Sequence, residues 1–447
     1  MQAGLVGRPG KLERRAPLSF AQQRLWFLQR LAPDSSAYNV FRILPLGETD
    51  PQVVRAALCE LARRHGPLRS RFPDDDGVPV QVIAPEPDID LQVCDLQVTG
   101  AAARSETIRI AESELERPFD LTSAPPVRAT LVRSGTRSWL VLVLHHLISD
   151  HWSWPILARE LSSLCEAFTA GRPSPLPELP LQFADYAEWQ QEWMGSEDFR
   201  SRLQTWKDRL TGAPALLDLP TDHQRPAVQS FRGAILDRQL PWAAVREVEA
   251  LGRSQRSTAY MSLLAVFFAL LQRLSGQDDL VVGTFVGGRG RVDLEGLVGF
   301  FSNTLPLRAD LGGRPTFREL LGRVRSVVLD ALEDEQVPLD RLVEELAPQR
   351  GLSHNPIFQV VFTVLEGGGT SLTREVKVAT SKFDLSFYVE MDANGNANLR
   401  CEYSTDLFER ETVAALLERY VRLLEAVGKE PDRPLAELSL LLPGELE

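Results

Sequence analysis

Three of the chain's six histidines lie within seven residues, in the segment His145-His146-Leu-Ile-Ser-Asp150-His151. The apolar run 139–144 comes directly before it, so the two adjacent histidines stand at the end of a predicted buried strand. Imidazole has the unperturbed pKa nearest neutrality, which makes it the usual side chain for proton transfer at physiological pH. A histidine pair can equally be structural, and this segment alone favours neither interpretation.

Regular elements must hold this segment in place. Residues 20–31 have apolar side chains at helical spacing behind Ser19, a typical N-cap residue. Further helices are predicted at 51–65, 105–116 and 156–168, and strands at 79–83, 127–133 and 139–144. Alternate prolines within 171–181 then favour an extended connector between two lobes.

The second half of the chain repeats this mixture of elements. Helices are predicted at 183–211, 243–254, 258–274, 316–333, 338–346 and 410–427, and strands at 232–240, 279–283, 303–309, 357–364, 374–380, 383–391 and 397–404. Without regular βαβ alternation, this order indicates an α+β fold with antiparallel or mixed sheets. We predict a linker, an N-terminal lobe, an inter-lobe connection and a C-terminal lobe, at 1–15, 16–175, 176–230 and 231–447.

Composition excludes several classes of function. The net charge of −12 argues against a nucleic-acid partner, because phosphate binding needs a basic surface. No apolar stretch reaches the roughly 18 residues of a membrane helix, and the first residues lack the apolar core of a signal peptide. The cysteines are scattered, without CxxC or zinc-site spacing, so we expect a reducing cytoplasm and no bound metal.

Further motifs accompany the histidines in a fixed order. They lie at 19–26, 64–72, 145–150, 183–189, 282–291, 299–304, 336–339 and 355–359. With these motifs the chain resembles the condensation domain of nonribosomal peptide synthetases, from about residue 17 to 430. A single His-His-x-x-x-Asp segment is weak evidence, whereas the whole series makes a chance match very unlikely.

The resemblance implies a fold and an activity that periodicity could not supply. The family has two lobes similar to chloramphenicol acetyltransferase, arranged as a V-shaped pseudo-dimer with an active-site tunnel between them. Donor and acceptor thioesters arrive on the phosphopantetheine arms of two peptidyl carrier proteins, and the acceptor amine attacks the donor to form a peptide bond. The domain itself is expected to bind no cofactor, to act beside adjoining synthetase domains in secondary metabolism such as antibiotic biosynthesis, and to be monomeric when isolated.

The resemblance also implies roles for the histidine segment. His146 is the catalytic residue, which either accepts the amine proton as general base or positions the amine, and both roles stay open. His145 is expected to support the loop. Asp150 could orient His146, but the favoured role is a buried ion pair that fixes the loop, with Arg289 as its partner and Arg291 as the second candidate.

Other residues are predicted to line the tunnel or contact substrate. Asn303 is expected to satisfy backbone groups more than to contact substrate, and Ser386 to contact the acceptor. The complete set of predicted lining residues is Arg24, His151, Trp152, Ser153, Ser302, Asn303 and Ser386.

His151 departs from the family pattern, which has glycine directly after the aspartate. Glycine allows positive φ and close approach of a substrate, and histidine adds a ring there. The ring could narrow the tunnel, turn away harmlessly, or block or reassign the activity. An L-configured donor and acceptor are favoured, with a D-configured donor still open; the alternatives are ester formation and an impaired or gating module.

Overall fold

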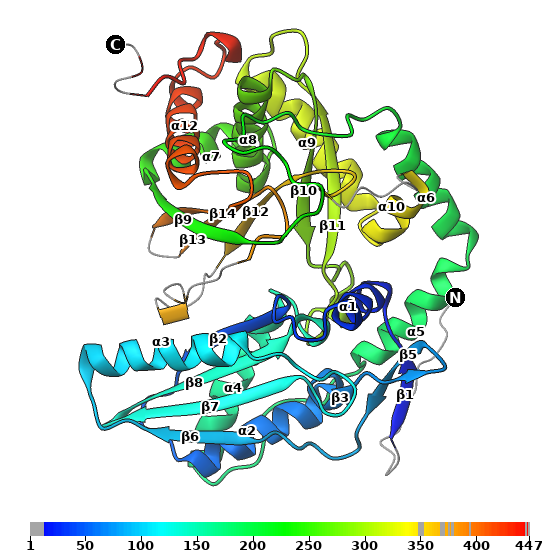
Figure 1. The fold of residues 1–447 in the computed structure, drawn as a ribbon, viewed down its shortest axis with the longest axis vertical. Coiled ribbons are helices and arrows are strands. Elements are labelled where there is room, and N and C mark those ends of the chain that lie inside the picture. Colours follow the sequence, from blue (N-terminus) through cyan, green and yellow to red (C-terminus); the bar gives the residue numbers. More distant parts are fainter. Residues whose placement is uncertain are drawn as a thin grey trace. The chain divides into compact units, whose positions relative to one another are not determined.

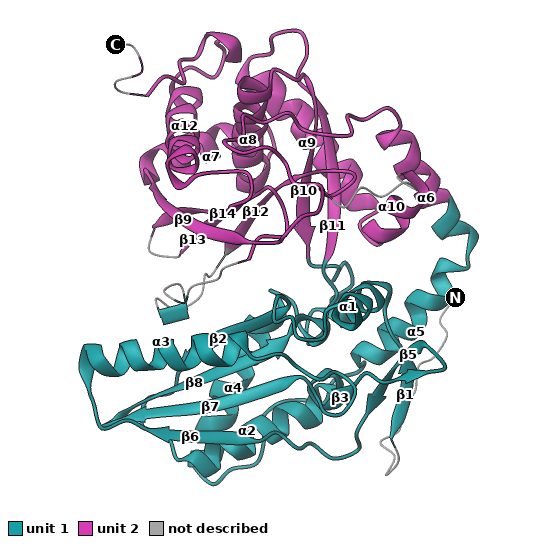
Figure 2. Cartoon of the chain, in the orientation of Figure 1, with its two compact units in different colours: residues 1–200, 287–302, 369–377 teal, residues 201–286, 303–368, 378–447 magenta. Residues whose placement is uncertain are grey.

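The computed structural model describes residues 13–346, 353–366, 372–373, 376, 380–392, 395–442 and 445. They form two compact units, each with its own sheet and helices (Figures 1 and 2). Unit 1 comprises Met1–Arg200, Gly287–Ser302 and Gly369–Lys377, and unit 2 comprises Ser201–Val286, Asn303–Gly368 and Val378–Glu447. Residues of the 287–302 segment therefore pack with unit 1, although both flanking strands belong to unit 2.

The main sheet of unit 1 has the strand order β2-β8-β7-β6, in which only β6 and β7 run parallel. Residues 138–145 of β8 are buried, because β8 is an inner strand with helices packed about the sheet. A smaller sheet joins β1, β3, β4 and β5. The bounds are β1 Arg14–Pro17, β2 Asn39–Pro45, β3 Ser70–Arg71, β4 Asp74–Asp75, β5 Val78–Ile83, β6 Leu91–Asp95, β7 Val127–Ser134 and β8 Arg137–His145.

Local signals explain where the helices of unit 1 begin. Ser19 caps α1 through a capping box with Gln22, and Asp50 caps α2, whose first residue is proline. α3 packs against β2 and β8, and α2 packs against α4 (Figure 1). The bounds are α1 Phe20–Leu31, α2 Pro51–Arg64, α3 Gly100–Glu116, α4 Ser153–Thr169 and α5 Phe183–Met194.

Unit 2 is built on a six-stranded mixed sheet with the order β11-β10-β12-β13-β14-β9. The strands are β9 Gly233–Leu240, β10 Asp279–Val286, β11 Asn303–Asp310, β12 Val360–Glu366, β13 Leu385–Met391 and β14 Ala397–Ser404. The helices are α6 Glu197–Leu210, which crosses the boundary between the units, α7 Trp242–Ser254, α8 Ala259–Ser275, α9 Phe317–Glu333, α10 Leu339–Leu346 and α12 Arg410–Lys429. The central helix α8 is buried at every position from 261 to 271.

In the part of the chain that the structure describes, no single helix meets the length and apolarity needed to cross a membrane. Among the helices described, α7 and α8 taken together meet these criteria, by length and composition alone, and their axes are bent by 109°. The 261–271 stretch of α8 lies in the core of unit 2.

The predicted α+β class with mixed sheets is confirmed, and most elements lie within a few residues of their predicted bounds. The helical structure predicted at 183–211 is confirmed, and it is divided near Gly195 into two helices, α5 and α6. The strand predicted from residue 357 begins at Val360, and most of the strand predicted at 374–380 lies outside the described residues. Strands β2 and β6 were not predicted.

Candidate functional site

The histidine segment forms the connection between β8 and α4. β8 ends at His145, which is paired with Asn39 of β2, and a single 3₁₀ turn follows at His146–Ile148. Two short polar residues, Ser149 and Asp150, then lead into the first turn of α4. An inner strand of the sheet and a core helix therefore fix both ends of the segment.

The contacts of His145 assign its tautomer. Its ring is buried, and Nδ1 accepts a hydrogen bond from the backbone N–H of Leu147 at 3.1 Å. The other nitrogen, Nε2, lies 3.4 Å from Oε1 of Gln29, which can only accept, so Nε2 carries the proton. Because the lone pair on Nδ1 is already used by the backbone, His145 holds the turn and has no free base to offer a substrate.

His146 is placed differently. It is the only residue from 145 to 150 whose side chain is not fully buried. Its backbone N–H donates to the carbonyl oxygen of Tyr38 at 2.7 Å, and its ring meets the edge of Phe300 at a centroid distance of 4.8 Å. The backbone and one aromatic neighbour thus restrict the imidazole; its Nδ1 is buried, while the residue as a whole is only partly buried.

Asp150 is the centre of a buried network. One carboxylate oxygen accepts from the backbone N–H and hydroxyl of Ser153 at 2.9 and 2.8 Å. Arg289 donates to both oxygens at 2.7 and 3.0 Å, and the backbone N–H of Phe301 adds a fifth contact at 3.1 Å. A carboxylate offers about four lone-pair sites, so none is left to orient His146.

Arg289 is the cation that compensates Asp150. Its side chain is 7% exposed, and its guanidinium also lies over the ring of Phe301, 4.4 Å from the centroid. Arg291, the second candidate partner, instead pairs with the nearby Asp293 and is half exposed. The network of Asp150 therefore ties α4 to the 287–302 segment within unit 1.

Glycines let the 287–302 segment approach so closely. Gly288 has a φ of +61°, and a Cβ there would lie 2.2 Å from the carbonyl oxygen of Phe301. A Cβ on Gly299 would lie 2.1 Å from the ring of Phe183 on α5. Larger residues at these two positions would displace the backbone that brings Arg289 to Asp150.

α1 supports the same turn from another direction. Gln22, in its first turn, is fully buried, and Nε2 donates to the carbonyl oxygen of Leu147 at 3.0 Å. Trp26, one turn further along, donates from its indole nitrogen to the carbonyl oxygen of Phe72 at 2.9 Å. The opening motif therefore positions the histidine turn through a side-chain amide.

His151 fits its backbone without strain, because it does not adopt positive φ. The ring is partly buried and meets the edge of Trp152, whose indole in turn covers Gly287. Burial, followed by the positive charge of Arg42, lowers the pKa of His151 to about 4. The side chain is therefore an uncharged ring at neutral pH.

This depressed pKa predicts how His151 affects stability at acidic pH. An unfolded histidine becomes protonated as the pH falls below about 6.5, whereas folded His151 resists protonation until about pH 4. Relative to His151→Asn, the wild type should therefore lose about 1–3 kcal/mol of stability as the pH falls from 6.5 to 4, and no pH-dependent difference should appear above pH 7. Denaturant unfolding at a series of pH values measures this; an equal pH dependence of the two proteins would contradict it.

The remaining predicted lining residues lie in different settings. Ser153 is fully buried, and its hydroxyl also contacts both backbone groups of Gly299, so it helps to hold the loop. Trp152 and Ser302 are partly buried, and Arg24 is exposed on α1. Ser386 lies on β13 in unit 2, fully buried.

Asn303 holds backbone groups at the start of β11. Its amide nitrogen donates to the carbonyl oxygens of Glu335 and Val337 at 2.8 and 2.6 Å. Its amide oxygen accepts from the backbone N–H groups of Thr304 and Leu339 at 2.9 and 3.1 Å. Both the nitrogen and the oxygen of the amide are thus engaged by backbone groups.

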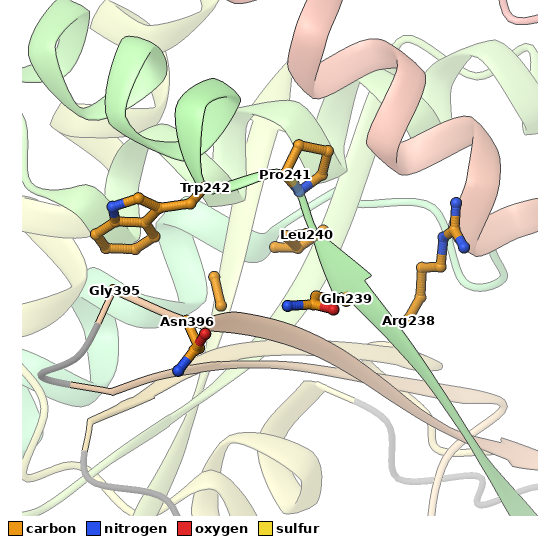
Figure 3. Close-up of a pocket in the computed structure, with 8 residues that line it drawn as sticks. Arg238, Gln239, Leu240, Pro241, Trp242, Gly395 and Asn396 are labelled. Carbon is orange, nitrogen blue, oxygen red and sulfur yellow. The ribbon is translucent and has the colours of Figure 1, made fainter.

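The structure has two pockets of note, one next to His145 and one that none of the predicted site residues lines. One in unit 1 has a volume of about 500 Å³ and includes Gln29 and Phe119, both of which contact the ring of His145. The other, of about 410 Å³ in unit 2, lies where β9 meets α7, with the indole of Trp242 packed over Gly395 (Figure 3). No cluster of three or more metal-ligating side chains occurs among the residues described.

Comparison with known proteins decides the family. The Condensation domain family matches residues 12–447, nearly the whole chain. The chain belongs to the condensation-domain family.

Relatives of this condensation domain are parts of large synthetases. It is 40% identical to the chondramide synthase cmdD of Chondromyces crocatus, over 95% of this chain and 11% of that protein. It is 39% identical to phosphinothricin tripeptide synthetase PhsC of Streptomyces viridochromogenes, over 96% of this chain and 41% of that protein. The chain thus spans less than half the length of either relative.

Solved structures agree on the fold. The X-domain from teicoplanin biosynthesis is 29% identical and superposes with a TM-score of 0.84, over 98% of this chain and 99% of that one. The condensation domain from the Monacolin K polyketide synthase MokA, at 22% identity, has a TM-score of 0.82 over 94% of this chain and 99% of that one. The fold similar to chloramphenicol acetyltransferase, expected for each half, is thereby confirmed.

The sequence missed several residues that build the site. Tyr38 and Gln29 contact the two histidines through a backbone carbonyl and a side-chain amide, and Phe119 packs on His145. Only the pairing of β2 with β8 reveals the place of Tyr38, directly before the strand. Phe300 lies inside a recognised motif, but no local pattern indicates its contact with His146.

Proposed function

We propose that this condensation domain joins a donor acyl or aminoacyl thioester to the amine of an acceptor aminoacyl thioester. Both substrates are carried on the phosphopantetheine arms of partner carrier proteins, and an L-configured donor and acceptor are favoured. The observation that supports this most is the difference in burial and hydrogen bonding among the residues of the histidine turn. His145 and Asp150 are buried and engaged by protein groups, whereas His146 between them is only partly buried.

The proposed reaction balances with the groups at hand. The acceptor nitrogen forms a C–N bond with the donor carbonyl carbon, and the C–S bond of the donor thioester breaks. The amine must lose a proton, which leaves on the released thiol or through His146. Positioning the amine lone pair against the carbonyl is the other way in which His146 contributes, since alignment of reactants lowers the barrier by itself.

The test uses loaded carrier proteins. A donor carrier and an acceptor carrier, each loaded with a defined aminoacyl group, are mixed with the domain, and intact-mass spectrometry records the mass of the acceptor carrier. An acceptor that gains the donor acyl group supports the proposal. Parallel reactions with L- and D-configured donors test the stereochemical preference, and equal rates with both would overturn it.

His151 provides a second prediction about the same assay. If its uncharged ring restricts the space beside the histidine turn, His151→Gly should raise the rate with bulky acceptors by roughly 10-fold and leave the smallest acceptors unaffected, as expected for relief of a steric contact. Initial rates over a series from glycyl to tryptophyl acceptors measure this. A rate profile identical to that of the wild type would remove His151 from the specificity determinants.

Two other functions remain candidates because of His151. An acceptor hydroxyl could replace the amine and give an ester, which hydroxyacyl acceptors in the same assay would reveal. A non-catalytic module is the other alternative; the X-domain, a structural neighbour, has been solved in complex with OxyB. Undiminished carrier binding without product from any acceptor would favour this module.

A further inference from the structure

The strands β13 and β14 have two contrasting faces. On one face Phe387 packs against Phe267 of α8 and Tyr420 of α12, at centroid distances of 4.8 and 6.1 Å. Side chains alternate along a strand, so the opposite face carries the residues between these apolar ones. That face is polar, with Ser386, Tyr388, Glu390, Asn398, Arg400 and Glu402.

Three of these residues form what we call the Glu402 cluster: Ser386, Tyr388 and Glu402. Ser386 is the direct cross-strand partner of Glu402, and Tyr388 is the next residue on the same face of β13. The hydroxyl of Ser386 is fully buried and lies near the Tyr388 hydroxyl, but it has no partner with hydrogen-bond geometry among the described residues. A buried hydroxyl without a partner is costly, so it indicates a group that the described residues do not supply.

The charge of Glu402 is poorly compensated. Its carboxylate accepts a long hydrogen bond, at 3.4 Å from the backbone N–H of Lys382. The Ser381 hydroxyl and the charge of Lys382 also lie close enough to act on it, but among the described residues no guanidinium or imidazole forms an ion pair with it. The neighbouring Arg400 is bound by Asp237 at 2.9 and 3.3 Å, with Glu390 at 3.8 Å. Burial raises the pKa of Glu402, although Lys382, Ser381 and Arg400 lower it in part.

Tyr388 completes the cluster as a neutral phenol. Burial, followed by the charge of Glu402, raises the pKa of Tyr388, so its hydroxyl stays protonated. It can donate one hydrogen bond and accept others. By contrast, the buried Glu160 of unit 1 is held by Arg64 with two contacts of 3.1 Å and by His65 at 2.8 Å. Among the described residues no guanidinium or imidazole holds Glu402 in this way, and the charge of Lys382 lowers its pKa only in part.

We propose that Ser386, Tyr388 and Glu402 bind a primary ammonium or amine group of an aminoacyl substrate. An ammonium group has three N–H donors, and the cluster offers three side chains with acceptor oxygens. The bound cation also supplies the positive counter-charge that compensates the carboxylate of Glu402. This inference deepens the proposed function, which requires amine-bearing substrates; Ser386 was expected to contact the acceptor, whereas Tyr388 and Glu402 had no assigned role.

The ammonium group can come from the α-amine or from a basic side chain, and two ligand pairs distinguish these sources. All are amide analogues of aminoacyl-pantetheine that cannot be hydrolysed. Glycyl is compared with acetyl for the α-amine, and N-acetyl-lysyl with N-acetyl-norleucyl for the side chain. The Kd of each ligand is measured by NMR titration of the full chain up to millimolar ligand. In at least one pair the amine-bearing ligand should have a Kd about tenfold lower than its partner, as expected for a charge-assisted hydrogen bond.

Glu402→Gln should bring that affinity ratio close to one, and Tyr388→Phe should reduce it while leaving the charge in place. Glu418→Gln is the matched control, because it removes the same charge from α12, which packs on the opposite, apolar face of the sheet and where Glu418 pairs with Arg238 at 2.7 Å. Thermal melting verifies that each variant is folded. If Glu402→Gln does not fold, the comparison of Tyr388→Phe with the wild type tests the proposal.

Equal affinities within both pairs in the wild type, or an unchanged ratio in Glu402→Gln and Tyr388→Phe, would overturn the ammonium site. Because the analogues form no product, this outcome is independent of catalysis. An amine preference without product in the loaded-carrier assay would refute amide synthesis and leave the ammonium site intact.

Discussion

His146→Ala should lower the rate of condensation by at least about 100-fold, the usual loss when a group that moves a proton in the transition state is removed. His146 combines a fixed backbone with a partly buried side chain, so the substitution removes the imidazole and few packing contacts. The rate is measured by intact-mass spectrometry with loaded carriers. Added imidazole should restore part of the activity if His146 transfers a proton, and none if it only aligns the amine.

The matched control is His223→Ala. His223 is exposed and pairs with Glu409 in unit 2, so its loss should leave the rate within about twofold of the wild type. A folded His146→Ala protein with near-normal turnover would show that the reaction does not depend on this imidazole. Catalysis would then rest on alignment by other groups.

The second large effect is expected on stability. Asp150→Asn leaves Arg289 buried without its full counter-charge, so unfolding should become about 3–5 kcal/mol easier, with a Tm lowered by roughly 10 °C. Arg289→Gln should cost a similar amount. The double variant should be less destabilised than the sum of the two by about 0.5–3 kcal/mol, because the two residues share one interaction.

Arg291→Gln is the control for this prediction. Arg291 lies two residues from Arg289, but its ion pair with Asp293 is half exposed and should contribute only about 0–1 kcal/mol. Denaturant and thermal unfolding of the four proteins give the comparison. Strict additivity of the Asp150 and Arg289 substitutions would contradict a direct coupling. Loss of activity in Asp150→Asn would follow from a displaced loop and would not by itself indicate a chemical role.

The sequence predicted those parts of the site that depend on local patterns. The apolar run before His145, the cap at Ser19 and the helix after the histidine turn follow from periodicity and capping, and all lie as predicted. The pairing of Asp150 with Arg289 spans 139 residues, and only the family resemblance made it predictable. Non-local contacts depend on which elements pack together, and local sequence does not encode that choice.

The weakest predictions involve edge strands and buried hydroxyl groups. β2 alternates in burial along its length, yet its mixture of polar and apolar residues gave no clear strand signal. Serine is usually found at the protein surface, but Ser153 is buried by its hydrogen bonds within the network of Asp150. In both cases a tertiary partner, β8 or Asp150, decides the structure.

The return of the 287–302 segment to unit 1 has a consequence for biosynthesis. The ribosome completes Asp150 long before Arg289, and at about 5–20 residues per second the delay is on the order of 10 s. During that interval the nascent first unit holds a carboxylate that lacks its guanidinium and the amide of Phe301. The turn carrying His146 can therefore reach its final form only after β9 and β10, the first two strands of unit 2, have been translated. The maturation of the site is thus a late event.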